Sequence, residues 1–218
     1  MCGRFSLTKS DKDTLKKRFR VKRVAGDQKP RYNIAPSDAV HAIVNTMRDE
    51  ITLARWGYIP HWMGADGLAK SVINARAETL MQKPFFKTSF RSRRCLIIAD
   101  GFYEWKRAGK AKHPYRVIVD DGSLFAFAGV WDTWMYDGNE LMTCAIITVA
   151  ANELMRPIHE RMPVIINADD EQAWLMSDDL VRAEEMLRPF ASERMRAYEI
   201  SPAVNSPTHD HADIVKPI

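Results

Sequence analysis

Apolar residues recur along most of the chain at the spacing of short β-strands. Val40, Ala42 and Val44 show the period of two that is typical of a half-buried strand. Apolar runs of strand length predict further strands over residues 5–7, 51–56, 94–105, 115–119, 124–130, 141–149, 163–166 and 198–201. Asp100-Gly101 predicts a kink or bulge inside the long strand, and Asp120-Asp121-Gly122 predicts a β-hairpin.

Helical spacing is less frequent. Leu15 and Phe19 share one face of a helix that should begin near Ser10, with Asp13 as the second member of a capping pair. Short helices are also expected over residues 78–81, 84–90, 152–155, 169–176 and 180–187. Many strands, single helices and no internal repeat or linker predict one α+β domain. We expect a curved mixed β-sheet or open barrel wrapped by short helices over residues 1–205, followed by a C-terminal tail over 206–218.

The composition is that of a soluble globular protein, with 218 residues, 46% hydrophobic and 28% charged. No apolar run approaches the ~18 residues of a membrane helix, and the first 20 residues lack the apolar centre of a signal peptide. We therefore expect no membrane association and a cytoplasmic location, at the nucleoid if the source is prokaryotic. Three widely spaced cysteines favour a reducing compartment over a disulfide framework or a metal site. We expect no metal and no cofactor. The net charge of +4 permits nucleic-acid binding without requiring it.

The chain begins Met1-Cys2-Gly3-Arg4-Phe5. Loss of Met1 would leave an N-terminal cysteine, which carries an amine and a thiol on adjacent carbons. The amine titrates near pH ~8 and the thiol near ~8.5, so both are partly nucleophilic at neutral pH. An amine attacks an aldehyde to give an imine, and the neighbouring thiol can close on that carbon to form a five-membered thiazolidine. The pentapeptide alone favours the alternative that Cys2 is a small packed hydrophobe, as free cysteines commonly are.

Three other polar residues lie in stretches built mainly of apolar or turn residues. Asn74 follows Ile73, Glu104 lies between two aromatic residues, and His159 occupies a loop before an apolar strand. Taken singly, they could be a turn or capping asparagine, a solvent-facing carboxylate and a surface histidine. A metal site of Cys2, Glu104 and His159 lacks any local ligand spacing.

Six motifs, taken together, are far more specific than these residues singly. In chain order they are MCGRF, RYNIAP, RWG, INARAET, ADGFYEW and IHERMP. This set resembles the SOS-response-associated peptidase (SRAP) family, whose members act on abasic sites in single-stranded DNA. The resemblance spans about residues 1–205. One departure is Ile98, where family members often have a proline, and it concerns the strand geometry only.

The resemblance implies a role for each candidate residue. Cys2, after loss of Met1, matches the nucleophile that captures the open-chain aldehyde of an abasic deoxyribose. Asn74 matches the asparagine that positions this cysteine and the opened sugar. Glu104 matches a proton shuttle in ring opening and imine formation. His159 matches the general acid and base at the sugar oxygen, which also assists reversal.

The resemblance also implies a surface for single-stranded DNA. Arg4 and Arg76 match phosphate contacts, and Arg161 is a further candidate because a guanidinium binds phosphate in a bidentate manner. Trp105, Pro36 and Trp62 would stack on bases or wedge them apart around the lesion. Such stacking contributes ~1–3 kcal/mol per base without regard to sequence.

Two other functions stay open from the sequence alone. A thiol peptidase would use the Cys2 thiol with His159 as base, and the same site could remove its own Met1. A non-catalytic reader of modified or single-stranded DNA would use the same arginines and aromatic residues. We expect a monomer, because no heptad or sustained apolar stripe suggests an assembly.

Overall fold

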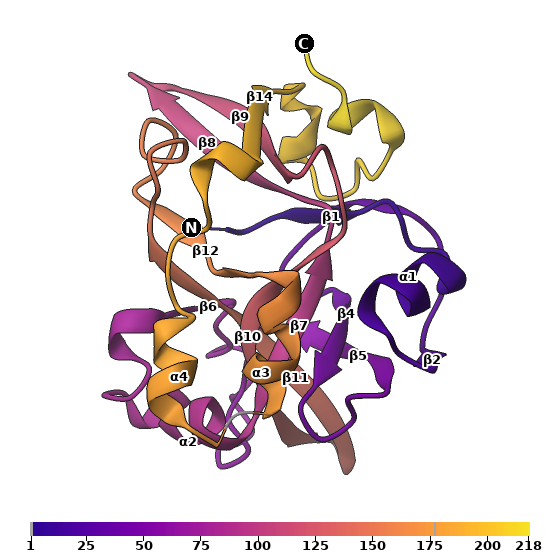
Figure 1. The fold of residues 1–218 in the computed structure, drawn as a ribbon, viewed down its shortest axis with the longest axis vertical. Helices are drawn as coiled ribbons and strands as arrows, with labels where there is room; N and C mark the ends of the chain where they lie inside the picture. The colour runs from indigo at the N-terminus through magenta and orange to yellow at the C-terminus, as the bar shows by residue number, and fades with distance from the viewer. Residues whose placement is uncertain (1, 177) are drawn as a thin grey trace.

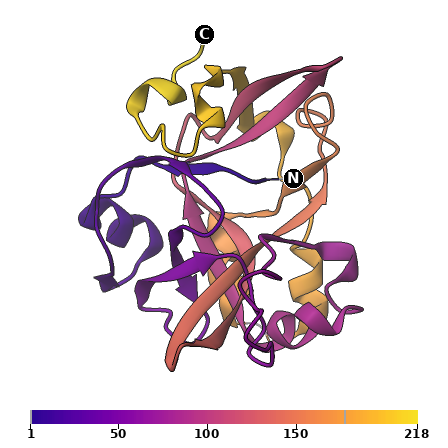
Figure 2. The same cartoon turned by 180° about the vertical axis from the view of Figure 1, so that it is seen from behind.

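Two β-sheets meet near the N-terminus of the chain (Figure 1). The computed structural model describes residues 2–176 and 178–218. The smaller sheet has the strand order β14-β9-β8-β1-β3, where β14 is Met195–Glu199, β9 Ala111–Val119, β8 Gly101–Ala108, β1 Phe5–Leu7 and β3 Arg31–Ile34. In both Figure 1 and Figure 2 this sheet lies in the upper part of the molecule, next to the C-terminal segment.

The larger sheet closes into a five-stranded mixed barrel, because β11 pairs with β10 on one side and, in parallel, with β5 on the other. The barrel strands are β4 (Ala39–Val44), β5 (Glu50–Trp56), β7 (Arg94–Ala99), β10 (Phe125–Tyr136) and β11 (Asn139–Ala150). Four short strands extend the pairing: β2 (Arg23–Val24), β6 (Asn74–Arg76), β12 (Arg161–Pro163) and β13 (Ile165–Ile166). The expected α+β class with a barrel core in a single domain is confirmed.

The helices are short and cover the barrel from outside. They are α1 (Lys12–Phe19), α2 (Pro84–Ser92), α3 (Glu171–Met176) and α4 (Leu180–Glu185), with 3-10 turns η1 (Ala77–Thr79), η2 (Ala168–Asp170), η3 (Ser192–Arg194), η4 (Pro202–Asn205) and η5 (Ala212–Val215). All of β7 is buried, in agreement with the apolar run that follows Arg94. Phe5 of β1 packs edge-on against Trp56 and Phe127, with ring centroids 5.0 and 5.6 Å apart, and so joins the smaller sheet to the barrel core.

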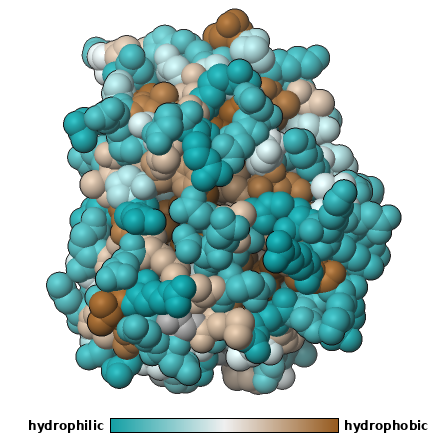
Figure 3. Space-filling view, in the orientation of Figure 1, coloured by the Kyte–Doolittle hydropathy of each residue, from teal (hydrophilic) through white to brown (hydrophobic). Residues whose placement is uncertain are grey.

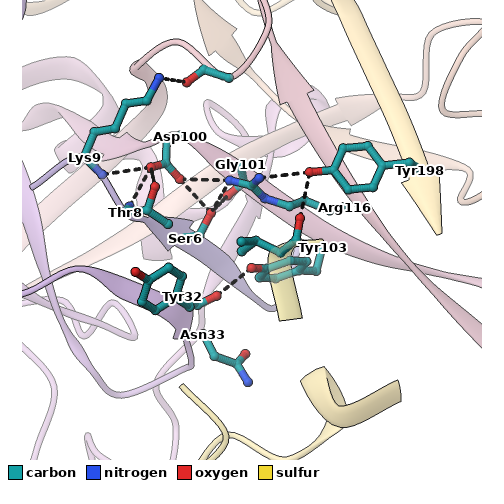
Figure 4. A network of polar contacts seen from close by, with 12 residues as sticks. Ser6, Thr8, Lys9, Tyr32, Asn33, Asp100, Gly101, Tyr103, Arg116 and Tyr198 are labelled. Atoms are coloured by element: carbon teal, nitrogen blue, oxygen red, sulfur yellow. Dashed lines mark hydrogen bonds and ion pairs between the residues drawn. The ribbon is translucent and has the colours of Figure 1, made fainter. Parts of the chain in front are cut away.

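The stretch 94–105 forms two strands in different sheets rather than one kinked strand. The chain leaves the barrel at Asp100, whose carboxylate is almost fully buried. It accepts hydrogen bonds from the hydroxyls of Ser6 (2.7 Å) and Thr8 (2.6 Å) and from the backbone N–H of Lys9 (3.1 Å), and pairs with Arg116 (Figure 4). Asp100 therefore fixes the end of β1 that leads away from Cys2.

Three local predictions are wrong. Asp120-Asp121-Gly122 does form a turn with positive φ, but no hairpin, because β9 pairs with β8 and β14 whereas β10 pairs within the barrel. The hairpin instead joins β10 to β11 through Asp137-Gly138. Residues 152–155 form a turn, not a helix. The α1 helix is capped by Asp11, whose carboxylate accepts the Thr14 N–H at 2.9 Å, while Ser10 bonds to the Gln28 carbonyl.

The C-terminal segment 206–218 is packed against the smaller sheet. Ile214 is fully buried in a cluster with Tyr103, Ile200 and Val204. The carboxylate of Asp210 accepts hydrogen bonds from the Arg31 guanidinium (2.6 Å) and from the backbone N–H of Asn33 (2.8 Å). The last residues thus form part of the folded body next to the start of the chain.

Candidate functional site

The residue expected as the nucleophile lies between the two sheets. The Cys2 side chain is fully buried, and its backbone carbonyl accepts a hydrogen bond of 2.9 Å from the Asn74 amide nitrogen. Asn74 belongs to β6, which runs parallel to β11 with Asn74 opposite Ile146. Residues 72 positions apart are thus joined directly at the N-terminus. The expected removal of Met1 concerns a residue outside the described range.

Glu104 reaches the same site from β8 and is only 2% exposed. Burial raises the pKa of its carboxyl group, while the positive charge of His159 acts in the opposite direction. Glu104 therefore lies close enough to His159 for their charges to interact. A carboxyl group with a raised pKa is suited to donate a proton as well as to accept one near neutral pH.

His159 lies in the loop that leads into β12. The backbone N–H of Arg161 donates a hydrogen bond of 3.0 Å to His159 Nδ1. The same Nδ1 also lies 3.2 Å from the Arg161 carbonyl oxygen, to which a protonated Nδ1 would donate. Both contacts are to the backbone of Arg161, so the loop fixes the orientation of the imidazole ring through its Nδ1 side.

The Cys2 thiol is not set up as a thiolate. Burial raises its pKa far above the ordinary value, and the nearby negative charge of Glu104 raises it further. The structure therefore brings together Cys2, Asn74, Glu104 and His159, with the cysteine sulfur in its protonated form. Such a site needs an acceptor for the thiol proton before sulfur can attack.

The three candidate phosphate-binding arginines differ in their surroundings. Arg76 is exposed on β6. Arg4 is half-buried and donates to the Asn33 side chain at 2.7 Å. Arg161 forms a bidentate ion pair with Glu78, at 2.6 and 3.0 Å, and also donates to Thr148.

The candidate stacking residues are spread over the surface. Trp105 is half-buried at the end of the buried part of β8, and its indole N–H donates to Asn205 at 2.7 Å. Trp62 is 56% exposed and packs edge-on against Phe85 of α2. Pro36 is exposed in the turn after β3. Figure 3 shows a largely hydrophilic face, with only small separate hydrophobic patches around the region where Figure 1 places the N-terminus.

Sequence reasoning missed three residues that support this site. Asn33 holds Arg4, Glu78 pairs with Arg161, and Asn205 holds Trp105. Asn33 and Glu78 lie inside the RYNIAP and INARAET motifs, so the motifs contained a signal for them. Asn205 lies beyond the six motifs and had no such signal.

Metal ligation has no candidate among residues 2–176 and 178–218, because no three His, Cys, Asp or Glu side chains are grouped to hold an ion. Within the same residues, no helix has the length and apolarity needed to cross a membrane.

Comparisons with known proteins agree over nearly the whole chain. Residues 1–207 match the family described as SOS response associated peptidase (SRAP). The abasic site processing protein YoqW of Bacillus subtilis is 41% identical, with 99% of each chain covered. The abasic site processing protein YedK of Escherichia coli is 30% identical, with 100% of each chain covered. The chicken abasic site processing protein HMCES is 28% identical over 88% of this chain and 68% of its own length.

The fold is also similar to that of solved structures. A crystal structure of a protein from Bacteroides thetaiotaomicron superposes with a TM-score of 0.88 at 29% identity, and 100% of each chain is covered. A family match across almost the entire sequence, full-length relatives and a shared fold lead to one conclusion: this chain belongs to the SRAP family.

Proposed function

We propose that this protein processes abasic sites in single-stranded DNA by linking them covalently to Cys2 once Met1 has been removed. The observation that carries the proposal is the position of Cys2. Its carbonyl is held by Asn74 in a buried site that also contains Glu104 and the oriented ring of His159. The relatives named as abasic site processing proteins support this choice of substrate.

The chemistry needs both nucleophiles of the terminal residue. The free amine of Cys2 attacks C1′ of the open-chain sugar, and the carbonyl oxygen leaves as water, which gives an imine. Sulfur then adds to C1′, and the thiol proton passes to the imine nitrogen through the Glu104 carboxylate. The net change is one C–N bond and one C–S bond formed and one water released. His159 exchanges a proton with the sugar oxygen as the ring opens.

The protonated state of the thiol supports this order of events. A buried thiol of raised pKa is a poor first nucleophile, whereas the amine can react without it. β-Elimination from the imine would break the DNA strand and constitutes a side path with lyase character. A peptidase requires the thiolate to attack first. Because the amine is the better first nucleophile here, a peptidase is the weaker proposal.

Binding of the single strand is assigned to Arg4, Arg76 and Arg161, with Trp105, Pro36 and Trp62 as stacking or wedging residues. Arg76 is exposed, and the hydrogen bonds that Arg4 forms with described residues go to uncharged oxygens. Both guanidinium groups are therefore available to a phosphate without first breaking an ion pair.

Intact-mass spectrometry tests the proposal directly. The purified protein is measured alone and after mixing with a single-stranded oligonucleotide that carries one abasic site. We expect a mass lacking Met1 and a heat-stable adduct whose linked peptide begins at Cys2. Cys2→Ala should abolish the adduct, and Cys2→Ser should give at most a hydrolysable imine, because the hydroxyl is a poorer ring-closing nucleophile.

The matched control is the same oligonucleotide with a tetrahydrofuran abasic analogue, which lacks the aldehyde. It should bind but form no adduct. A mature Cys2 terminus without any adduct would favour a thiol peptidase or a non-catalytic reader of DNA. Retention of Met1 would remove the aminothiol on which the proposal depends.

A further inference from the structure

Two of the assigned DNA contacts share one partner in the C-terminal part of the chain. The indole N–H of Trp105 donates to the Asn205 side-chain oxygen at 2.7 Å. The Arg4 guanidinium donates to the backbone carbonyls of Val204 (2.9 Å) and Asn205 (3.4 Å). The turn η4, which ends at Asn205, therefore contacts both the strand that carries Trp105 and the residues that precede β1.

This turn is itself held rigidly. The amide nitrogen of the fully buried Asn33 lies within hydrogen-bond distance of the carbonyls of Val204 (3.2 Å), Ser206 (2.9 Å) and His209 (2.9 Å), so its two hydrogens are shared among three acceptors. Its side-chain oxygen accepts from Arg4 at 2.7 Å. The fully buried side chain of Val204 packs below the turn. Since these contacts use backbone carbonyls, they do not depend on the Asn205 side chain.

Among the described residues, the side chain of Asn205 takes part in one hydrogen bond, in which it accepts the Trp105 indole proton. The ring is half-buried and packs against the cluster of Tyr103, Ile200, Val204 and Ile214. The hydrogen bond to Asn205 adds a directional contact at the indole N–H, which restricts rotation of the ring about its side-chain bonds. Stacking on a base requires a defined orientation of the ring, and a ring held in advance loses less entropy on binding.

We propose that Asn205 is a positioning residue for DNA binding, which acts by fixing the plane of the Trp105 ring at the rim of the site. The inference rests on the proposed function and extends it to a part of the chain outside the six motifs.

A double-mutant cycle tests the coupling. Asn205→Ala removes the acceptor, Trp105→Phe removes the donor but keeps an aromatic ring, and the third variant carries both changes. Affinity is measured by fluorescence anisotropy with a labelled single strand that carries the tetrahydrofuran analogue, so that no adduct forms. We expect Asn205→Ala to weaken binding by roughly threefold to tenfold, the range for one lost hydrogen bond. The double variant should bind no more weakly than Trp105→Phe alone.

Asn139→Ala, at the tip of the β10–β11 hairpin, is the matched control and should leave the affinity unchanged. Circular dichroism should show the same melting temperature for Asn205→Ala and the native chain. Additive effects of the two substitutions, or unchanged affinity in Asn205→Ala, would overturn the inference while native binding upholds the proposed function. Absence of binding by the native chain would overturn both.

Discussion

At the scale of single residues, burial determines which chemistry each group can support. Glu104 and Cys2 both have raised pKa values because they are removed from water, and their negative forms would repel one another. The result is a site that favours neutral groups and protonated sulfur. His159 lies close enough to Glu104 for their charges to interact, and the backbone of Arg161 orients its ring.

The raised pKa of Glu104 predicts a pH-dependent difference in stability. The folded state favours the protonated carboxyl, so native stability is full below the ordinary value of 4.5 and decreases as pH rises through the folded-state pKa. Glu104→Gln keeps the shape without the charge. We expect it to match the native melting temperature near pH 4 and to exceed it at pH 7–8 by about 2–4 °C, which corresponds to ~1 kcal/mol.

Thermal unfolding followed by circular dichroism across this pH range checks the prediction, with crosslinking measured in parallel. The variant should lose most crosslinking activity despite its higher stability. A variant that is less stable than the native protein at pH 8 would show that the carboxylate contributes favourable interactions that exceed its burial cost.

At the scale of elements, contacts between strands and turns far apart in sequence hold the site together. Asp100 ties the barrel strand β7, the sheet strand β8 and the end of β1 into one polar network (Figure 4). In a second contact, the ion pair of Glu78 and Arg161 joins η1 to β12. The Asp100 network stabilises the fold, whereas the ion pair with Glu78 occupies the guanidinium group of Arg161, a candidate for binding phosphate.

Asp100→Asn should destabilise the protein severely. It places an amide where the backbone N–H of Lys9 and the hydroxyl of Thr8 both donate, and it leaves Arg116 without its buried charge partner. We expect a loss of about 3–5 kcal/mol in the free energy of unfolding, measured by urea denaturation. Asp137→Asn, at an exposed turn, should change it by less than ~0.5 kcal/mol. Similar results for both variants would contradict the role given to Asp100.

Glu78→Gln should strengthen binding to single-stranded DNA. Glu78 is exposed and engages both terminal nitrogens of Arg161, so a phosphate must compete with it. Removing the charge should raise the affinity by up to about fivefold, the value of an exposed ion pair, and steepen its dependence on salt.

Glu140→Gln is the control for the change in net charge. Glu140 is exposed near the tip of the β10–β11 hairpin. It lies six residues along β11 from Ile146, which pairs with Asn74, so Glu140 and Ile146 are about 20 Å apart. Glu140→Gln should not raise the affinity for single-stranded DNA comparably. Both variants are measured by fluorescence anisotropy titration. Weaker binding by Glu78→Gln would mean that Glu78 orients Arg161 for DNA instead of competing with it.

At the scale of the whole molecule, the two ends of the chain meet. Arg4 is bonded to carbonyls 200 and 201 positions away, and the C-terminal segment covers Tyr103 of the smaller sheet. The C-terminal segment therefore packs next to the turn η4, whose Val204 and Asn205 contact Arg4 and Trp105.

Ile214→Ala tests this packing. Ile214 is fully buried, so the shortened side chain should leave a cavity and cost about 2–4 kcal/mol, with partial loss of DNA affinity. Ile218→Ala makes the same change at a side chain that is 77% exposed and should cost less than ~0.5 kcal/mol. Chemical denaturation of both variants provides the comparison. Equal stability would show that the segment is only loosely attached.

Features that depend on local order along the chain can be predicted from the sequence. The potential aminothiol follows from the position of Cys2, and most strands follow from short apolar runs. The six motifs in their order along the chain were sufficient to indicate the family. Strand pairing, the raised pKa of Glu104, the orientation of the His159 ring and the packing of the C-terminal segment follow only from the folded structure. Each of these depends on burial or on groups brought together by folding, such as Trp105 and Asn205, which lie 100 positions apart. Local patterns carry no information about such partners.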